Sequence, residues 1–382
     1  MKLGRSKPNN RSLNALYLTT SILNFGLAMI GIFVPIYIFK LTGNFYYLPA
    51  FYGMVSLSAF VSLLLCPKFL PRLGAARGVL LANVFRVLNL VFLLAAPNFR
   101  PALWGAAVFE GLIIPTFWVT YHSIFSAAGR DGNYGGKIAR MGVFVSIVSA
   151  LAPFFGGLVV ATFGFPTLYG IGMILILLST VPVVWIGDHL GFQDVPVRKI
   201  LGEVFSNKWR PMLTGFFGNR LEIVFAAIIW PLFIFGLSKS FTSLGAITSV
   251  FTVVGVLFMV AAGQMVDSFG SRKILPAGAL LLAPFWLLTG LTSSPAVLAI
   301  LNGYRGAVAP FYGIAVESFF YRIAKRNPFL AIIKREVSIH LSIFLSLFLT
   351  AVLWFFFPAN WPILFLPAAL GMLLSMTFVR AK

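Results

Sequence analysis

The stretch "PLFIFGLSKSFTSLGA" (residues 231–246) repeats "PIYIFKLTGNFYYLPA" (residues 35–50) at a shift of 196. Seven of the 16 aligned positions are identical, namely Pro35/Pro231, Ile38/Ile234, Phe39/Phe235, Leu41/Leu237, Phe45/Phe241, Leu48/Leu244 and Ala50/Ala246. The same shift carries Gly74 onto Gly270, and a shift of 195 places "FEGLIIP" (109–115) over "YRGAVAP" (304–310). This internal repeat predicts two equivalent halves.

The composition indicates whether these halves lie in water or in a lipid bilayer. The chain has 382 residues, of which 59% are hydrophobic and 10% charged, whereas a soluble domain carries about 25% charged residues. Apolar runs of about 20 residues cross the hydrocarbon core as helices. We therefore expect an all-α polytopic membrane protein with twelve transmembrane helices in two parallel six-helix repeats. The expected spans are residues 14–38, 46–66, 77–96, 102–124, 138–162, 166–187, 211–236, 243–263, 274–292, 296–318, 336–357 and 361–379.

The basic residues predict the orientation of these spans. Most of the 29 Lys and Arg residues fall in segments on the side of the N-terminus, and the opposite segments carry Lys40, Arg100 and Lys239. Basic segments stay on the cytoplasmic side, so we expect both termini in the cytoplasm and the chain in the cell membrane. Topology and contact with anionic lipids account for the net charge of +20 better than nucleic-acid binding does.

The repeat also predicts the domain organisation. Residues 1–187 form the N-terminal six-helix half, residues 188–210 a cytoplasmic linker, and residues 211–382 the C-terminal half. Within the linker, "VRKILGEVFSNK" (197–208) places apolar residues at helical spacing, with basic residues mostly on the other side. This pattern predicts a helix lying at the membrane surface.

Parallel six-span halves are an architecture of secondary transporters, and two motifs make the resemblance specific. The stretch "GQMVDSFGSRK" (263–273) resembles the loop motif G-x-x-x-D-[RK]-x-G-[RK]-[RK] of the major facilitator superfamily. The matching residues are Gly263, Asp267, Gly270 and Arg272. Ser268 and Ser271 replace basic residues of the motif.

The second motif, "APFFGG" (152–157), is similar to the family's G-P-x-x-G-G motif in the fifth span. Pro153, Gly156 and Gly157 match, and Ala152 replaces the first glycine. In the family this motif is commonest among proton-coupled exporters, so the resemblance favours efflux. The alternative is structural, with a kink at Pro153 and close helix packing at the glycines.

The first half departs from the family pattern in "PKFLPRLGAAR" (67–77), where Pro67 and Pro71 replace the first glycine and the acid. The resemblance implies that the acid of the second half, Asp267, has the gating role. We expect it to meet the N-terminus of span 5, where the helix dipole and the basic Lys137 and Arg140 favour a carboxylate. The alternative is a solvated Asp267 in a polar turn.

Ionisable residues inside the predicted spans are costly, at about 2.5–3.5 kcal/mol each on insertion scales, and they usually mark a transport pathway. The candidates for a substrate and proton pathway are Arg86, Glu110, Arg220, Glu222 and Arg305, with Asn24 in register with Arg220. The repeat makes Glu110 equivalent to Arg305. It likewise makes His122 equivalent to Glu317, a pair that we expect at the cytoplasmic end.

The resemblance places spans 1, 4, 7 and 10 around a central cavity, and with it Glu110, Arg220 or Glu222, and Arg305. Glu110 and Glu222 are then candidate proton carriers, because burial and a neighbouring arginine shift a carboxyl pKa in opposite directions. Arg305 would attract an anionic group. The alternative is that ion pairs only join the halves, and that His122 and Glu317 reach lipid headgroups.

These features predict a secondary active transporter that moves a small anionic or amphipathic molecule by alternating access, coupled to protons. The rival is a membrane protein of the same fold that does not transport, such as a scaffold, a receptor or a lipid scramblase. An enzyme is not expected, because "GRDGNYGGKI" (129–138) fails the phosphate-loop pattern. The three His residues lack metal-ligand spacing. We expect no cofactor, no metal and a monomer.

Overall fold

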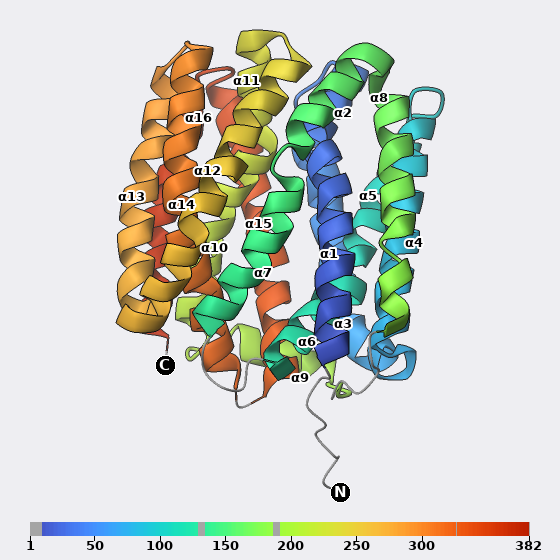
Figure 1. Cartoon of the computed structure of the whole chain (residues 1–382), viewed down its shortest axis with the longest axis vertical. Helices are drawn as coiled ribbons and strands as arrows, with labels where there is room; N and C mark the ends of the chain where they lie inside the picture. Colours follow the sequence, from blue (N-terminus) through green and yellow to red (C-terminus); the bar gives the residue numbers. More distant parts are fainter. Residues whose placement is uncertain (1–9, 129–133, 186–191, 326, 382) are drawn as a thin grey trace, which may run out of the picture.

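In the computed structural model, the described residues are 10–128, 134–185, 192–325 and 327–381, and every regular element in these ranges is a helix (Figure 1). The helices before the linker are α1 (Asn10–Ile30), η1 (Gly31–Phe33), α2 (Val34–Thr42), α3 (Tyr47–Leu73), α4 (Ala75–Ala95), α5 (Ala102–Ile113), η2 (Ile114–Trp118), α6 (Val119–Ala128), α7 (Tyr134–Ser149), α8 (Ala152–Leu178) and η3 (Val181–Trp185). The linker contains α9 (Val197–Val204). The later helices are α10 (Arg210–Val224), η4 (Phe225–Ile229), α11 (Trp230–Ser238), α12 (Phe241–Phe269), α13 (Ser271–Leu291), α14 (Pro295–Ala324), α15 (Pro328–Phe356), α16 (Trp361–Ser375) and η5 (Met376–Arg380).

Ten segments of the described residues are long and apolar enough to cross a membrane, whereas the sequence predicts twelve spans. The count differs in two places. The 44-residue segment Gly142–Trp185 contains a break at Gly164, where φ is +79°. Figure 1 shows α8 turning back at the upper end of the bundle. The 30-residue α14 is long enough, but it carries Arg305 and Glu317 and is not among the ten.

The helices group by their order in the sequence. Most of α1 to α8 lies on one side of Figure 1 and most of α10 to α16 on the other, with α7 and α12 between them. Across this boundary, which we call the seam, α12 packs against α7 and α8, and α15 packs against α3 and α6. We call the end where α1 begins the lower end, and the opposite end the upper end (Figure 1).

Backbone turns recur at the spacing of the sequence repeat. Gly43 and Lys239, which are 196 residues apart, both end a helix in the left-handed conformation, with φ of 65° and 51°. Gly74 and Gly270, again 196 apart, are single-residue turns with φ of 81° and 85°. Glycine adopts positive φ without a steric penalty, which explains its use at three of these four turns.

Two helix boundaries differ from the prediction. The expected loop 67–77 is wrong, because α3 continues through Pro67 and Pro71 to Leu73, and Gly74 alone joins it to α4. Neighbouring helices let a membrane helix tolerate proline in this way. The expected start of a span at residue 336 is also wrong, because Asn327 caps α15 and accepts from the Leu330 N–H, so α15 begins at Pro328.

The linker helix α9 lies at the lower end of the bundle and packs against it. Its apolar residues Ile200 and Val204 are fully buried, and α9 contacts α3 and α15. Glu203 accepts from the Lys334 ammonium at 3.1 Å, which ties α9 to α15. The linker's residues 188–191 lie outside the described residues.

Candidate functional site

The predicted pathway residues of the first half are Arg86 on α4 and Glu110 on α5. Arg86 is buried, donates to Asn83 Oδ1 at 2.9 Å and stacks over the Phe117 ring at 4.3 Å. Glu110 interacts electrostatically with Arg86 and lies near Tyr52 of α3, although no ion pair within 4 Å joins Glu110 to any described residue. The first half therefore holds its two charges close together within one group of helices.

The second half pairs its charges directly. Arg305 on α14 donates to Glu222 Oε1 on α10 at 2.6 Å, and both side chains are largely buried. The guanidinium also lies over three aromatic rings at 4.8–5.4 Å, those of Phe251, Phe285 and Trp286. A charge-assisted hydrogen bond and aromatic faces both stabilise a desolvated guanidinium.

Glu110 and Arg305 are equivalent in the sequence repeat, but the structure does not bring them together. Each interacts with a charge of its own half instead. Their following glycines do share an environment. A Cβ on Gly111 would lie 2.6 Å from the carbonyl oxygen of Val55, and one on Gly306 would lie 2.5 Å from that of Phe251. Both glycines thus allow the same close helix crossing.

The lower end contains a buried polar group that crosses the seam, which we call the Arg335 cluster. Its members are His122 on α6, Glu317 and Tyr321 on α14, and Arg335 and Glu336 on α15. Arg335 donates to Glu317 Oε1 and, at 2.5 Å, to His122 Nε2, and it lies 3.6 Å from Glu336. The structure therefore brings the predicted pair His122 and Glu317 into one cluster.

His122 connects α6 to both later helices of the cluster. Its Nδ1 lies 2.6 Å from the Tyr321 hydroxyl on α14. The Arg335 guanidinium on α15 lies 2.5 Å from His122 Nε2 and 3.0 Å from Nδ1, and arginine can only donate in these contacts.

Sequence reasoning missed Arg335, Glu336 and Tyr321. It counted Arg335 as a residue of a cytoplasmic loop, because a basic residue before an apolar run usually marks the end of a span. The available signal was "NP" at 327–328, since Asn at the N-cap followed by Pro at the first position begins a helix. A start there places Arg335 two turns inside α15.

Arg220 on α10 forms neither a side-chain hydrogen bond nor an ion pair within 4 Å with any described residue. The guanidinium groups of Arg86, Arg305 and Arg335, in contrast, each donate to a side-chain oxygen. The Arg220 Nε is buried without a hydrogen-bond partner. It interacts electrostatically with Arg335, Glu336 and Glu317. Asn24, its counterpart in the repeat, lies on α1 and donates to the Thr20 carbonyl at 2.7 Å.

The loop motif lies at the lower end of α12 and α13. Gly263 is buried in α12, and Gly270 makes the turn into α13. Arg272 donates to the Ala381 carbonyl at 2.9 Å, within the second half. Asp267 lies in the last turn of α12. Its expected partners Lys137 and Arg140 have side chains outside the described part of the chain.

The motif in span 5 lies at close helix contacts. Pro153 is in the first turn of α8. A Cβ on Gly156 would lie 2.2 Å from the Met29 carbonyl oxygen, and one on Gly157 would lie 2.5 Å from that of Phe241 across the seam. Bulk at either glycine would force the helices apart, so the motif sets how closely α8 approaches both neighbours.

Aromatic side chains bridge the seam at the upper end. Lys40 lies over the rings of Phe235 and Phe241 at 5.9 and 5.2 Å, and Phe45 stacks on Trp354 at 3.8 Å between ring centroids. These contacts join the two sides of the seam, as the Arg335 cluster does at the lower end. The seam is therefore bridged at both ends.

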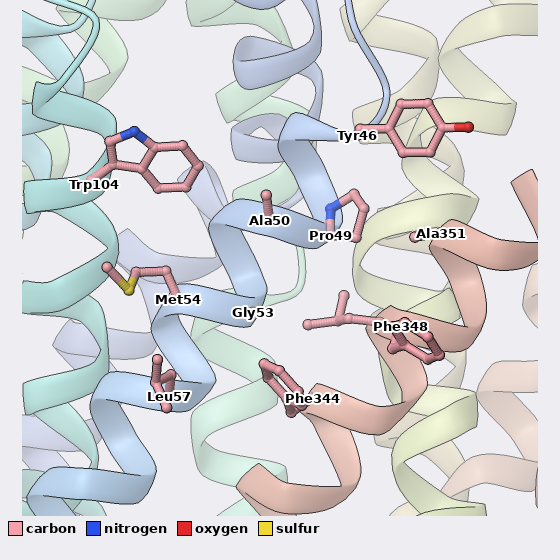
Figure 2. Close-up of a pocket in the computed structure, with 11 residues that line it drawn as sticks. Tyr46, Pro49, Ala50, Gly53, Met54, Leu57, Trp104, Phe344, Phe348 and Ala351 are labelled. Carbon is pink, nitrogen blue, oxygen red and sulfur yellow. The ribbon is translucent and has the colours of Figure 1, made fainter. Parts of the chain in front are cut away.

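A cavity of about 430 Å³ lies between α3 and α15 toward the upper end (Figure 2). Its lining is apolar and includes Leu57, Trp104, Phe344 and Phe348, which are exposed at the outer surface of the bundle. It contains none of the predicted pathway residues. Among the residues that the structure describes, no group of three His, Cys, Asp or Glu side chains could hold a metal ion.

Comparisons with known proteins identify the fold. No known family profile matches the sequence, and no curated protein matches it. Solved structures do match. The human organic anion transporter MFSD10 (TETRAN) has a TM-score of 0.71 at 12% identity, covering 98% of this chain and 100% of that one. A bacterial homologue of the iron transporter ferroportin, in its outward-facing state, has a TM-score of 0.67 at 15% identity over 96% and 98%. The major facilitator superfamily transporter FucP, in its outward conformation, has a TM-score of 0.68 at 13% identity over 97% and 99%.

The chain therefore has the fold of major facilitator superfamily transporters, as the sequence motifs predicted. Its apolar helices and this fold together make it a multi-pass membrane protein.

Proposed function

We propose that this protein is a secondary active transporter that moves a small molecule across the cell membrane by alternating access. In this proposal twelve spans form two parallel halves, residues 1–187 and 211–382, and the lower end faces the cytoplasm. The turns at Gly43 and Lys239 and at Gly74 and Gly270 support the repeat, because each pair keeps the shift of 196. The basic residues of the lower end support the orientation.

The observation that carries the proposal is the Arg335 cluster. A buried polar cluster is weak evidence for stability, because apolar replacement of a whole buried ion pair is often neutral or stabilising. A scaffold would gain little from such a cluster, whereas a transporter needs a cytoplasmic closure that can open. His122, Glu317 and Arg335 provide it through hydrogen bonds that water can replace. When the halves rock, the contacts at the lower end break while the aromatic contacts at the upper end hold, and the reverse motion does the opposite.

Glu110 and Glu222 are the proposed proton carriers. Each carboxylate interacts with an arginine of its own half, Arg86 and Arg305 respectively. Protonation of Glu222 would remove the charge that holds Arg305 at 2.6 Å and would free the guanidinium. The proton, the substrate and the conformation are then linked through the same pair of side chains. The motif of Pro153, Gly156 and Gly157 favours efflux as the direction.

Transport can be measured in proteoliposomes that contain a pH-sensitive dye. We expect a panel of small anionic, neutral and cationic molecules to include at least one whose protein-dependent flux responds to an imposed pH gradient. Glu110→Gln or Glu222→Gln should abolish this coupled flux, and exchange of substrate at equal pH should persist. Unchanged coupled flux in both variants would reject the proton carriers, and no protein-dependent flux for any compound would reject transport.

A further inference from the structure

Arg220 is a half-buried arginine that forms no ion pair of its own with the described residues. Charged residues inside a membrane bundle almost always pair with one another or with backbone carbonyls, because an unpaired charge is costly there. Arg305 has Glu222, and Arg335 has both Glu317 and Glu336. No ion pair within 4 Å joins Arg220 to any residue in the described ranges, and its Nε has no hydrogen-bond partner.

The guanidinium of Arg220 lies at the seam. It interacts electrostatically with His122 of α6 on one side and with Glu336 and His340 of α15 on the other. The helix that carries it, α10, packs against α15. The Arg220 side chain is only half-buried, so part of it is accessible to a small solute.

A second group points to the same ligand. His340 on α15 is 95% buried, at 5% exposure, and its Nδ1 has no hydrogen-bond partner within the described part of the chain. Buried polar atoms are nearly always hydrogen-bonded, so two such atoms within electrostatic reach of each other need a common explanation. An oxyanion supplies it, because its oxygens can accept from Arg220 Nε and from the Nδ1–H of a neutral His340 ring together.

We propose that Arg220 and His340 bind the anionic group of the ligand, which is a small organic anion with a carboxylate or similar oxyanion. A cationic or neutral ligand without an oxyanion would leave the Arg220 guanidinium without a charged acceptor in hydrogen-bond contact. Glu317 and Glu336 interact electrostatically with Arg220, but both form their ion pairs with Arg335. Only the statement that the anion is transported rests on the proposed function, because binding can be measured without transport.

The test is thermal unfolding of the detergent-purified protein at constant ionic strength. The probes are acetate, benzoate and inorganic phosphate, with acetamide and benzamide as neutral counterparts. A ligand that binds the folded state raises Tm, so we expect at least one anion to raise Tm by about 3 °C or more while the amides do not. The shift should disappear in Arg220→Gln and persist in Arg72→Gln, which removes an exposed arginine of the lower end.

Arg220→Lys and His340→Asn keep the test decisive if Arg220→Gln does not fold. Lysine retains the charge but lacks the planar fork, so titration calorimetry should show affinity about tenfold or more weaker. The proposal is overturned if no anion shifts wild type, if the amides match the anions, or if both of these variants bind as wild type does.

The binding and transport experiments fail separately. If anions bind in an Arg220-dependent way but no compound shows flux, the proposed transport function is rejected and the proposed anion site stands. Flux of an uncharged compound that is unaffected by Arg220→Gln would reject the anion site and leave the proposed function.

Discussion

Arg305 shows which properties of a single residue can be predicted from the sequence and which require the structure. Its charge in an apolar run is visible in the sequence, and so is its equivalence to Glu110. Its partner is not visible, because Glu110 and Glu222 lie at similar depth and the choice depends on how each helix is rotated. The structure selects Glu222 at 2.6 Å and adds three aromatic rings. For Arg335 the sequence failed at an earlier step. The predicted span began at residue 336, so Arg335 was assigned to a loop and not to the buried part of a helix.

The pairing predicts compensation between Arg305 and Glu222. Removing one partner leaves a buried unpaired charge, so Arg305→Leu or Glu222→Leu alone should destabilise the protein by about 3–5 kcal/mol. The double variant Arg305→Leu/Glu222→Leu should unfold close to wild type in chemical denaturation in detergent.

The matched control for this pair is Arg305→Leu/Glu110→Leu, which removes residues that are equivalent in the repeat but not in contact. We expect the stability of this control variant to stay below that of wild type. Equal stability of the two double variants would contradict the pairing.

At the scale of the helix, spans and repeats could be predicted because apolar length and periodicity are local properties. The helix ends followed the local signals only in part. Gly74, Pro67 and Pro71 all fall in the predicted loop 67–77, but α3 continues through both prolines and only Gly74 forms the turn. Helix crossings could not be predicted, because they depend on which small residue faces which neighbour. Gly306 at the crossing of α14 with α12 is an example.

Gly306 and Gly313 provide a matched test on one helix. A Cβ at Gly306 would lie 2.5 Å from the Phe251 carbonyl oxygen, whereas nothing lies within 4 Å of a Cβ at Gly313. Gly306→Val should therefore destabilise the protein by about 1–3 kcal/mol through overpacking. Gly313→Val should be nearly neutral. Thermal unfolding in detergent compares the two, and equal shifts in Tm would contradict the close crossing of α12 and α14.

At the scale of the molecule, the repeat and the loop motif were sufficient to predict the transporter fold. They could not predict the conformation, because the same sequence must adopt more than one state in a transporter. The structure adds two sets of contacts across the seam, aromatic at the upper end and polar at the lower end. The sequence contained the residues of both, but their contacts join segments that are far apart in the chain, such as His122 and Arg335.

The central claim is that the halves move relative to each other when the Arg335 cluster breaks. Paired spin labels can measure this by electron–electron resonance in a Cys66→Ser background. Arg77 and Lys273 are exposed at the lower end, and Asn98 and Ser293 are exposed at the upper end. In each pair one residue lies at an end of α4 and the other at the same end of α13, on opposite sides of the seam.

The comparison is wild type against Arg335→Gln, with Arg322→Gln as a control that removes an exposed arginine near the same end. The account predicts that Arg335→Gln lengthens the lower distance while the upper distance stays the same or shortens, and that Arg322→Gln changes neither. Identical distance distributions at both ends in wild type and Arg335→Gln would contradict it.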